Sequence, residues 1–282
     1  MFRPMMPTFV SRMLLLGVAL LGPAAMAAEP TQIVFKNGRS VPLSALSLQG
    51  TNLVVTGEVE GYAAGQSFPF DSADHVYGER PEAVGQAIAL LVSGKPAEAA
   101  KLLEPVLAAH QLTSKIPGNF WLEAAHAAIV ANALDGKAPK ADAIGKEISE
   151  TRPGRGVDTF ARLGKALLLP ATTKIEERLE ALKDFTTDDQ PAAVAAYATF
   201  FTAKLLRDAK RDPEALESFL TVTGVYPTGN IFLNAAAEVN AADILSGLTR
   251  REEALALLTS ASRNAKGTVL ADEAKRRLDS LK

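Results

Sequence analysis

Apolar and polar positions follow two different patterns along the chain, and the change between them falls near residue 80. From Gln32 to Tyr77, short apolar runs are separated by glycine-containing turns, which is typical of β-strands. Beyond Pro81, apolar residues recur at helical spacing to the end of the chain. The pattern therefore predicts a small β module at residues 28–79 and a helical domain at residues 80–282.

The β module is predicted to be a meander of about five short strands, or a small barrel. Its clearest signal is Asn37-Gly38, because both central positions of a two-residue hairpin need a positive φ. Further apolar runs follow at 41–43, 45–48 and 53–56, and residues 71–74 form a polar turn before the last strand.

The helical domain is predicted to contain five helix pairs. Pro81 and Glu82 suit the first turn of a helix, and Ser93-Gly94 is typical of a helix end. The predicted pairs are 82–93 with 96–110, 118–135 with 139–151, 156–169 with 173–185, 191–209 with 212–226, and 230–247 with 250–264. A final charged helix at 268–281 is expected to cap the stack.

An internal repeat supports these pairs. The same spacing of alanine, leucine and alanine occurs three times, and a glutamate precedes the last alanine in each copy. The copies are Ala87, Leu90 and Ala99; Ala203, Leu206 and Ala215; and Ala242, Leu245 and Ala254. The last two copies lie 39 residues apart and the first two 116, or three periods, so two more copies are expected in between. A period of this length with helical internal spacing predicts an α-α solenoid.

The fourth unit resembles the tetratricopeptide repeat. Ala215, Phe219, Val222 and Pro227 match that family's second helix, and Ala203 with Leu206 matches its first. The period here is longer than the family's usual value of about 34 residues, and units two and three keep fewer of its positions. The β module, with Lys-Asn-Gly-Arg at 36–39 and Phe-Pro-Phe at 68–70, resembles the small SH3-like barrels that precede helical repeats in some bacterial envelope proteins.

Residues 1–27 have the features of a cleavable signal peptide. Arg3 and Arg12 provide a positive start, nine mostly apolar residues follow at 13–21, and Ala25-Met26-Ala27 is a typical cleavage site. The apolar run is too short to span a bilayer, which needs about 20 residues. We therefore expect export, with cleavage after Ala27 or Ala28, to the periplasm or beyond, and no membrane span in the mature chain.

Composition narrows the classes of partner. The 30 basic and 32 acidic residues are interspersed, without the basic face that nucleic acid would require. No cysteine is present, which excludes disulfides, thiolate metal sites and lipoprotein acylation.

The sequence shows no catalytic motif. His75, His110 and His126 each lack a second histidine at metal-ligand spacing, and neither a phosphate-binding loop nor a nucleophile elbow occurs. We expect no enzyme activity, no metal and no cofactor. The single tryptophan, Trp121, is interpreted as an apolar plug between units one and two rather than a ligand contact.

A solenoid more often binds its partner on the concave side. The concave positions implied by the tetratricopeptide resemblance are Glu123, His126, Tyr197, Phe201, Lys204, Arg207, Asn240 and Asp243. A mixed aromatic and charged strip of this kind suits an extended peptide. The alternative is that Lys204 and Asp243 only pair across neighbouring helices.

The preferred interpretation is therefore an exported, non-catalytic interaction protein that binds a protein or peptide partner in the cell envelope. The alternative is an envelope glycan-binding protein or enzyme that uses the solenoid groove, although only Tyr197 on the strip could stack on a sugar. A third possibility, based on fold analogy alone, is an accessory of an envelope energy-transduction or outer-membrane assembly complex.

Overall fold

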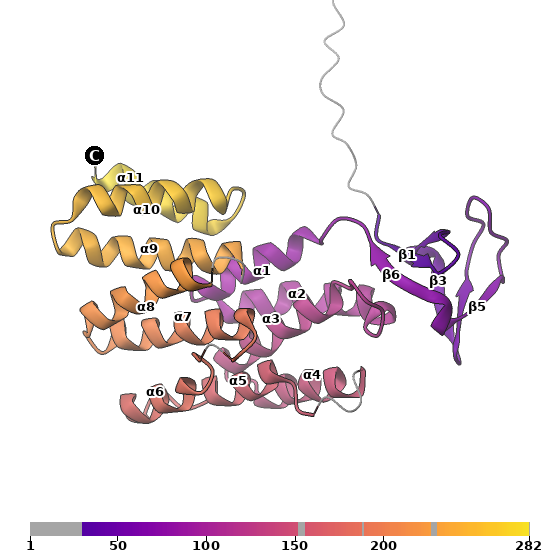
Figure 1. The fold of residues 1–282 in the computed structure, drawn as a ribbon, viewed down its shortest axis with the longest axis horizontal. Coiled ribbons are helices and arrows are strands. Elements are labelled where there is room, and N and C mark those ends of the chain that lie inside the picture. The colour runs from indigo at the N-terminus through magenta and orange to yellow at the C-terminus, as the bar shows by residue number, and fades with distance from the viewer. Residues whose placement is uncertain (1–29, 152–155, 188, 227–229, 282) are drawn as a thin grey trace, which may run out of the picture.

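The computed structural model describes residues 30–151, 156–187, 189–226 and 230–281. A small β region lies at one end of the molecule, and the helices form the rest (Figure 1). The predicted signal peptide lies outside the described residues. No helix in the described ranges is both long and apolar enough to cross a membrane.

The strands form two antiparallel sheets, ordered β2-β1-β6 and β3-β4-β5. Their bounds are β1 Gln32–Phe35, β2 Ser40–Pro42, β3 Leu46–Gln49, β4 Asn52–Val55, β5 Ser67–Pro69 and β6 Ala73–Tyr77. A hairpin does join β1 and β2 at Asn37-Gly38, but the expected two-residue turn is wrong. Of these two residues only Gly38 has a positive φ, 79°, and it donates its amide hydrogen to the Phe35 carbonyl at 2.8 Å, so Lys36 and Asn37 are the central residues of the turn. Asn37 Oδ1 accepts a hydrogen bond from the Arg39 amide at 3.0 Å. The simple meander is wrong: β6 returns to pair with β1, which places buried Val76 opposite buried Ile33.

Eleven α-helices occupy the described part of the chain after residue 80. Their bounds are α1 Glu82–Val92, α2 Pro96–His110, α3 Trp121–Leu134, α4 Ala138–Thr151, α5 Thr159–Leu167, α6 Ile175–Lys183, α7 Ala192–Asp208, α8 Asp212–Val225, α9 Ile231–Gly247, α10 Arg251–Asn264 and α11 Val269–Leu281. They correspond to the predicted pairs and the final helix. The first helices of the pairs start at intervals of 39, 38, 33 and 39 residues, so the two expected intermediate copies are α3–α4 and α5–α6.

The connection between α2 and α3 completes the core of the β region. Ile116 is 2% exposed and packs with the buried residues of both sheets. Val76 donates its amide hydrogen to the Pro117 carbonyl at 2.9 Å, and Gly118, with φ +73°, approaches Val76 so closely that a Cβ would lie 3.1 Å from its carbonyl oxygen. The two parts therefore share packing, although the sequence pattern changes near residue 80.

Four of the five pairs use the same turn between their helices. The first helix ends with one residue in the left-handed region, and the next amide donates back five positions, as Lys95 does to the Leu90 carbonyl at 2.9 Å. The left-handed residues are Gly94, Gly136, Lys210 and Thr249. The shared turn fixes how each second helix folds back on the first.

The glutamate of the sequence repeat pairs with a basic residue of this turn. Lys95 Nζ lies 3.6 Å from Glu98 Oε1, Arg211 Nη2 lies 2.5 Å from Glu214 Oε2, and Arg250 Nη2 lies 2.5 Å from Glu253 Oε2. The repeated alanines pack where the two helices meet; Ala87, Ala99, Ala203, Ala215, Ala242 and Ala254 are all at most 1% exposed. The repeat thus records both the turn and the close packing of each pair.

Thr249 strains its turn, because a β-branched residue disfavours a positive φ and here φ is 61°. We expect Thr249→Gly to raise the free energy of unfolding by about 0.5–1 kcal/mol. Glycine removes the strain of the left-handed conformation, and this gain outweighs the larger conformational entropy that glycine gives the unfolded chain. The reverse change at the matching position, Gly94→Thr, should lower it. Chemical denaturation followed by circular dichroism measures both, and a destabilised Thr249→Gly would contradict the shared turn.

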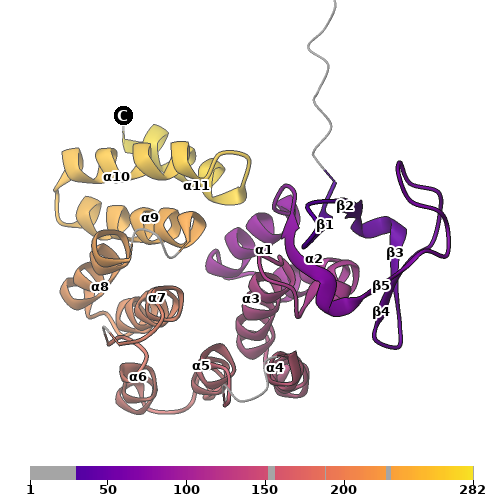
Figure 2. The ribbon, with the colours of Figure 1, turned by 45° about the vertical axis from the view of Figure 1, so that its right-hand side comes forward.

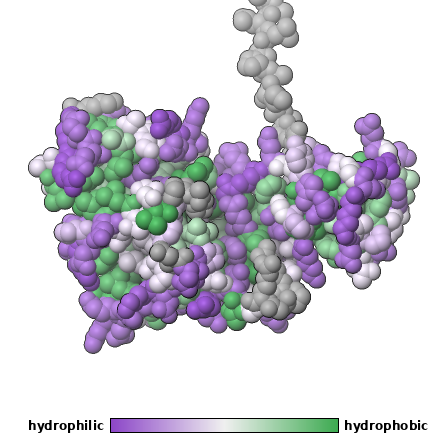
Figure 3. Space-filling view, viewed as in Figure 1, coloured by the Kyte–Doolittle hydropathy of each residue, from purple (hydrophilic) through white to green (hydrophobic). Residues whose placement is uncertain are grey.

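The first helices of the pairs, here called the inner helices (α1, α3, α5, α7 and α9), form a closed ring. Each packs against the next, and α9 packs against α1, which also contacts α11 (Figure 2). Phe232 at the start of α9 fills the space beside Gly85, where a Cβ would lie 2.6 Å from its ring. The contact of α9 with α1 therefore closes the ring, and α11 packs on α1 as well as on α10. In Figure 3, hydrophobic residues on the visible face form patches over the helical part, separated by hydrophilic ones.

Candidate functional site

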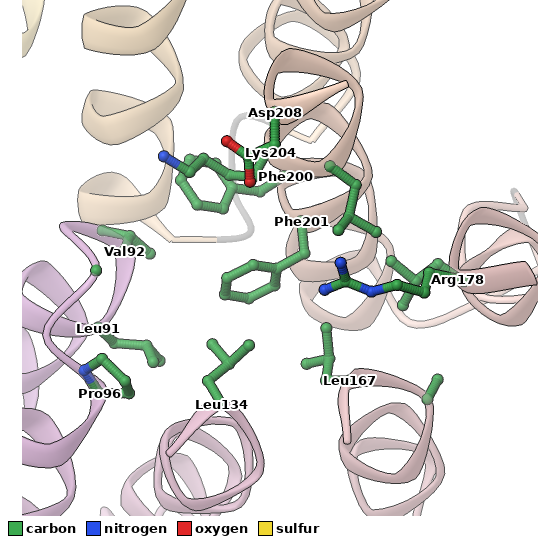
Figure 4. Close-up of a pocket in the computed structure, with 14 residues that line it drawn as sticks. Leu91, Val92, Pro96, Leu134, Leu167, Arg178, Phe200, Phe201, Lys204 and Asp208 are labelled. Atoms are coloured by element: carbon green, nitrogen blue, oxygen red, sulfur yellow. The ribbon is translucent and has the colours of Figure 1, made fainter. Parts of the chain in front are cut away.

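A pocket with a volume of about 260 Å³ opens where four inner helices end. We call it the central pocket (Figure 4). It is bounded by α1, α3, α5 and α7 together with α6, and its lining residues are Leu91, Val92, Gly94, Pro96, Leu134, Ala166, Leu167, Arg178, Leu182, Phe200, Phe201, Lys204, Leu205 and Asp208.

The apolar lining comes from the last turns of several inner helices, such as Leu91 in α1, Leu134 in α3 and Leu167 in α5. These leucines do not share one repeat position, because Leu91 lies three residues before the left-handed Gly94 whereas Leu134 lies two before Gly136. Phe201 points into the space between these helices in Figure 4. Its ring is held by Phe200, at 5.4 Å between ring centroids in an edge-to-face arrangement. The result is a pocket whose lining is mainly apolar.

Three charged side chains line the apolar surface of the pocket. Lys204 and Asp208 come from α7, and Arg178 comes from α6. Within the described ranges, neither Lys204 nor Arg178 has a carboxylate within 4 Å or a side-chain hydrogen bond. The pocket therefore presents two cations that no acidic side chain of the described ranges contacts directly.

Burial lowers the pKa of the Lys204 ammonium, and the nearby Arg207 and Arg277 lower it further, while Asp208 and Asp243 oppose these effects. The charged form of Lys204 is thus held in an unfavourable environment. An anion bound beside it would relieve part of that cost.

A second, more polar pocket of about 450 Å³ adjoins the central pocket. It lies between the end of α1 and helices α9 and α11, and it shares Lys204 and Val92 with the central pocket. We call it the polar pocket. Lys204 therefore stands at the junction of an apolar space and a polar one.

The structure does not present the predicted concave strip as one open groove. Tyr197 and Phe201 are 4% and 8% exposed, so the expectation of exposed aromatic rings is wrong. The ring of inner helices is closed, and Tyr197 packs edge-to-face on Phe160 at 5.7 Å. Tyr197 therefore offers no stacking surface of the kind that the glycan alternative requires.

Charged members of the strip are mostly engaged with each other. Arg207 donates to Asn240 Oδ1 at 2.8 Å and to Asp243 Oδ2 at 3.0 Å, and Asp243 also pairs with Arg277 at 3.1 Å. Pairing across neighbouring helices thus occurs, but its cation is Arg207 rather than Lys204. Of the predicted strip, Phe201 and Lys204 line the central pocket.

Glu123 and His126 lie at the other end of the inner helices. Glu123 accepts two hydrogen bonds from the Arg80 guanidinium, at 2.8 and 2.5 Å. The His126 ring stacks on Phe160 at 4.1 Å, and its Nε2 lies 3.3 Å from Asp158. These contacts join α3 to the segment before α1 and to α5, so both residues hold helices together.

Asp158 gives the fold a dependence on pH. Burial acts to raise the pKa of its carboxyl, but hydrogen bonds from His126 and from the amides of Phe160 and Ala161 outweigh burial and lower the pKa below its ordinary value. Because the pKa of this carboxyl is lower in the folded chain than in the unfolded chain, the ionised carboxylate stabilises the fold. This stabilisation is fully present above the unfolded pKa of about 3.9 and is lost as the pH falls through the folded pKa. Asp158→Asn should keep the helix cap and reduce this loss of stability at acid pH in pH-dependent melting. Asp142→Asn, at an exposed position of α4, should leave the loss unchanged.

Sequence reasoning missed Arg178, Asp208 and most of the apolar lining. Arg178 stands among acidic residues of α6, and nothing in its local pattern distinguishes it from a solvated helix face. A large aliphatic residue near the end of each of α1, α3 and α5, namely Leu91, Leu134 and Leu167, is the signal that could have located the pocket. In the described ranges, no cluster of histidine and acidic residues could hold a metal ion.

Searches against protein-family models, curated proteins and solved structures found no match to this chain.

Proposed function

We propose that this protein is an exported, non-catalytic interaction protein of the tetratricopeptide type, with a small SH3-like module before its helical repeats, and that it binds a protein or peptide partner in the cell envelope. The signal-like segment at residues 1–27 supports export. The helix pairs with a shared turn and buried alanines support the family.

The observation that carries the binding role is the central pocket. Its lining is mainly apolar and fixed by ring packing, and beside that lining stand two cations that no carboxylate of the described ranges contacts. Its volume is near the lower end of small-ligand pockets, which begin at about 300 Å³. A space of this size suits one apolar side chain or short chain end, so the partner would present a protruding group rather than a long segment.

The test is affinity capture from an envelope fraction with the mature, tagged chain as bait. Ala166→Phe places a ring into the central pocket from α5 and should abolish capture of the specific partner, because the space is then filled. Lys146→Met, at an exposed position of α4, is the control and should capture normally.

Melting curves establish that both variants fold, and the mass of the exported protein should correspond to cleavage after Ala27 or Ala28. Equal capture by wild type and Ala166→Phe would remove the central pocket as the binding site. Retention of this protein in the cytoplasm would contradict its proposed role in the cell envelope.

A further inference from the structure

We propose that the central pocket binds a monoanionic carboxylate joined to a short apolar group, with the carboxylate on Lys204 and the apolar group between Leu134, Leu167 and Phe201. This inference rests on the proposed function and names the chemistry of the group that enters the pocket. Two sources carry such a group: the free carboxyl end of a peptide whose last side chain is apolar, and a medium-chain fatty acid.

The shape of the site supports a ligand of two parts. The central pocket is lined mainly by aliphatic and aromatic side chains, whereas the adjoining polar pocket is lined by Ser93, Asn240 and several charged residues. Lys204 belongs to both. A ligand with its apolar group in the first space therefore places a neighbouring polar group beside the Lys204 ammonium.

The pattern of ion pairs singles out Lys204 as the anion partner. The neighbouring arginines are already engaged, since Arg207 binds Asp243 and Arg277 binds both Asp243 and Glu273. Lys204 lies in the same region without such a partner among the described residues. A half-buried cation in apolar surroundings gains a charge-assisted hydrogen bond when a carboxylate arrives.

The balance of charge favours a single negative charge over two. Arg178 and Lys204 contribute two positive charges to the pocket lining, and Asp208 contributes one negative charge. Figure 4 shows Arg178 and Lys204 on different sides of the Phe201 ring, so Lys204 holds the carboxylate while Arg178 adds to the positive field. A phosphate dianion would leave a net negative site beside Asp208.

The experiment is calorimetric titration of the folded mature chain with two pairs of probes. One pair is octanoate and octan-1-ol, and the other is N-acetyl-Gly-Leu and its C-terminal amide. In each pair the apolar group is the same and only the charged end differs. We expect at least one acid to bind, with its neutral partner weaker by about tenfold or more, as expected for loss of a charged hydrogen bond. The pair that binds identifies the source.

Variants connect the binding to the assigned residues. Lys204→Met retains the apolar stem and removes the charge, so acid binding should weaken about tenfold or more while the neutral probe is unaffected. Lys146→Met, an exposed position outside the pocket lining, should behave as wild type. Ala166→Phe should abolish binding of both members of the pair.

Three results would overturn the inference: no binding by either acid, equal binding of acid and neutral probe, or unchanged acid binding by Lys204→Met. These results are distinguishable from failure of the proposed function. If partner capture is lost in Ala166→Phe but intact in Lys204→Met, the central pocket binds the partner but the assignment of a carboxylate ligand is wrong. Capture that is intact in both variants rejects the role itself.

Discussion

Replacing Trp121 with alanine is expected to lower the free energy of unfolding by about 3–5 kcal/mol, the range for deleting a large buried aromatic side chain. Trp121 begins α3, is fully buried, and belongs to the large core cluster of the helical part. The deletion removes its packing and leaves a cavity that the surrounding helices cannot fill completely. Urea unfolding followed by circular dichroism measures the loss.

Trp121→Phe is the matched control. The indole Nε1 is buried and has no hydrogen-bond partner in the described part of the protein, so its removal takes away an unsatisfied donor as well as apolar area. This variant should lose much less stability than Trp121→Ala. A loss below about 1 kcal/mol in the alanine variant would place Trp121 outside the core. Trp121, interpreted from the sequence as an apolar plug, is thus buried in the core of the helical part.

The second large effect is expected for Gly164→Leu, which should lower the free energy of unfolding by about 1–3 kcal/mol or more. Gly164 is where α5 crosses α3, and a Cβ there would lie 2.6 Å from Cγ2 of Ile129. Ile129 is 1% exposed and cannot move aside without shifting its own helix. Thermal melting of the folded chain measures the change.

Gly224→Ala serves as the control for Gly164→Leu. Gly224 lies in α8, and a Cβ added there would meet no atom of the described residues within 4 Å. Alanine should therefore be neutral at this position or stabilise by up to about 1 kcal/mol through its higher helix propensity. Equal behaviour of the two glycine variants would show that α5 and α3 do not meet at Gly164.

The predictable part of the fold is the part encoded locally. Helix starts such as Pro81-Glu82 and the hairpin at Asn37-Gly38 depend on neighbouring residues alone, so their patterns predict them well. The recurring glutamates also carried information, because each pairs with the turn three residues earlier, as Glu214 does with Arg211.

Features that depend on distant segments could not be predicted in the same way. Gly85 and Phe232 reveal their contact only once the ring has closed. Packing on Phe160 of α5 buries Tyr197, which the tetratricopeptide resemblance had suggested would be exposed. For the site, the pattern identified Lys204 but assigned it the wrong possible partner. Arg178 enters the pocket from a helix whose sequence resembles an ordinary charged surface.

The contact between α1 and α9 changes how the stack can come apart. In an open row of helix pairs, each terminal unit has a single neighbour, so it frays first and an additional unit can be added at the end. Here the first inner helix packs against both α3 and α9. The ring of inner helices therefore has no free terminal unit at which local unfolding could begin. The ring also fixes the number of helix pairs, because duplicating or deleting a pair would prevent closure, whereas it would only change the length of an open solenoid.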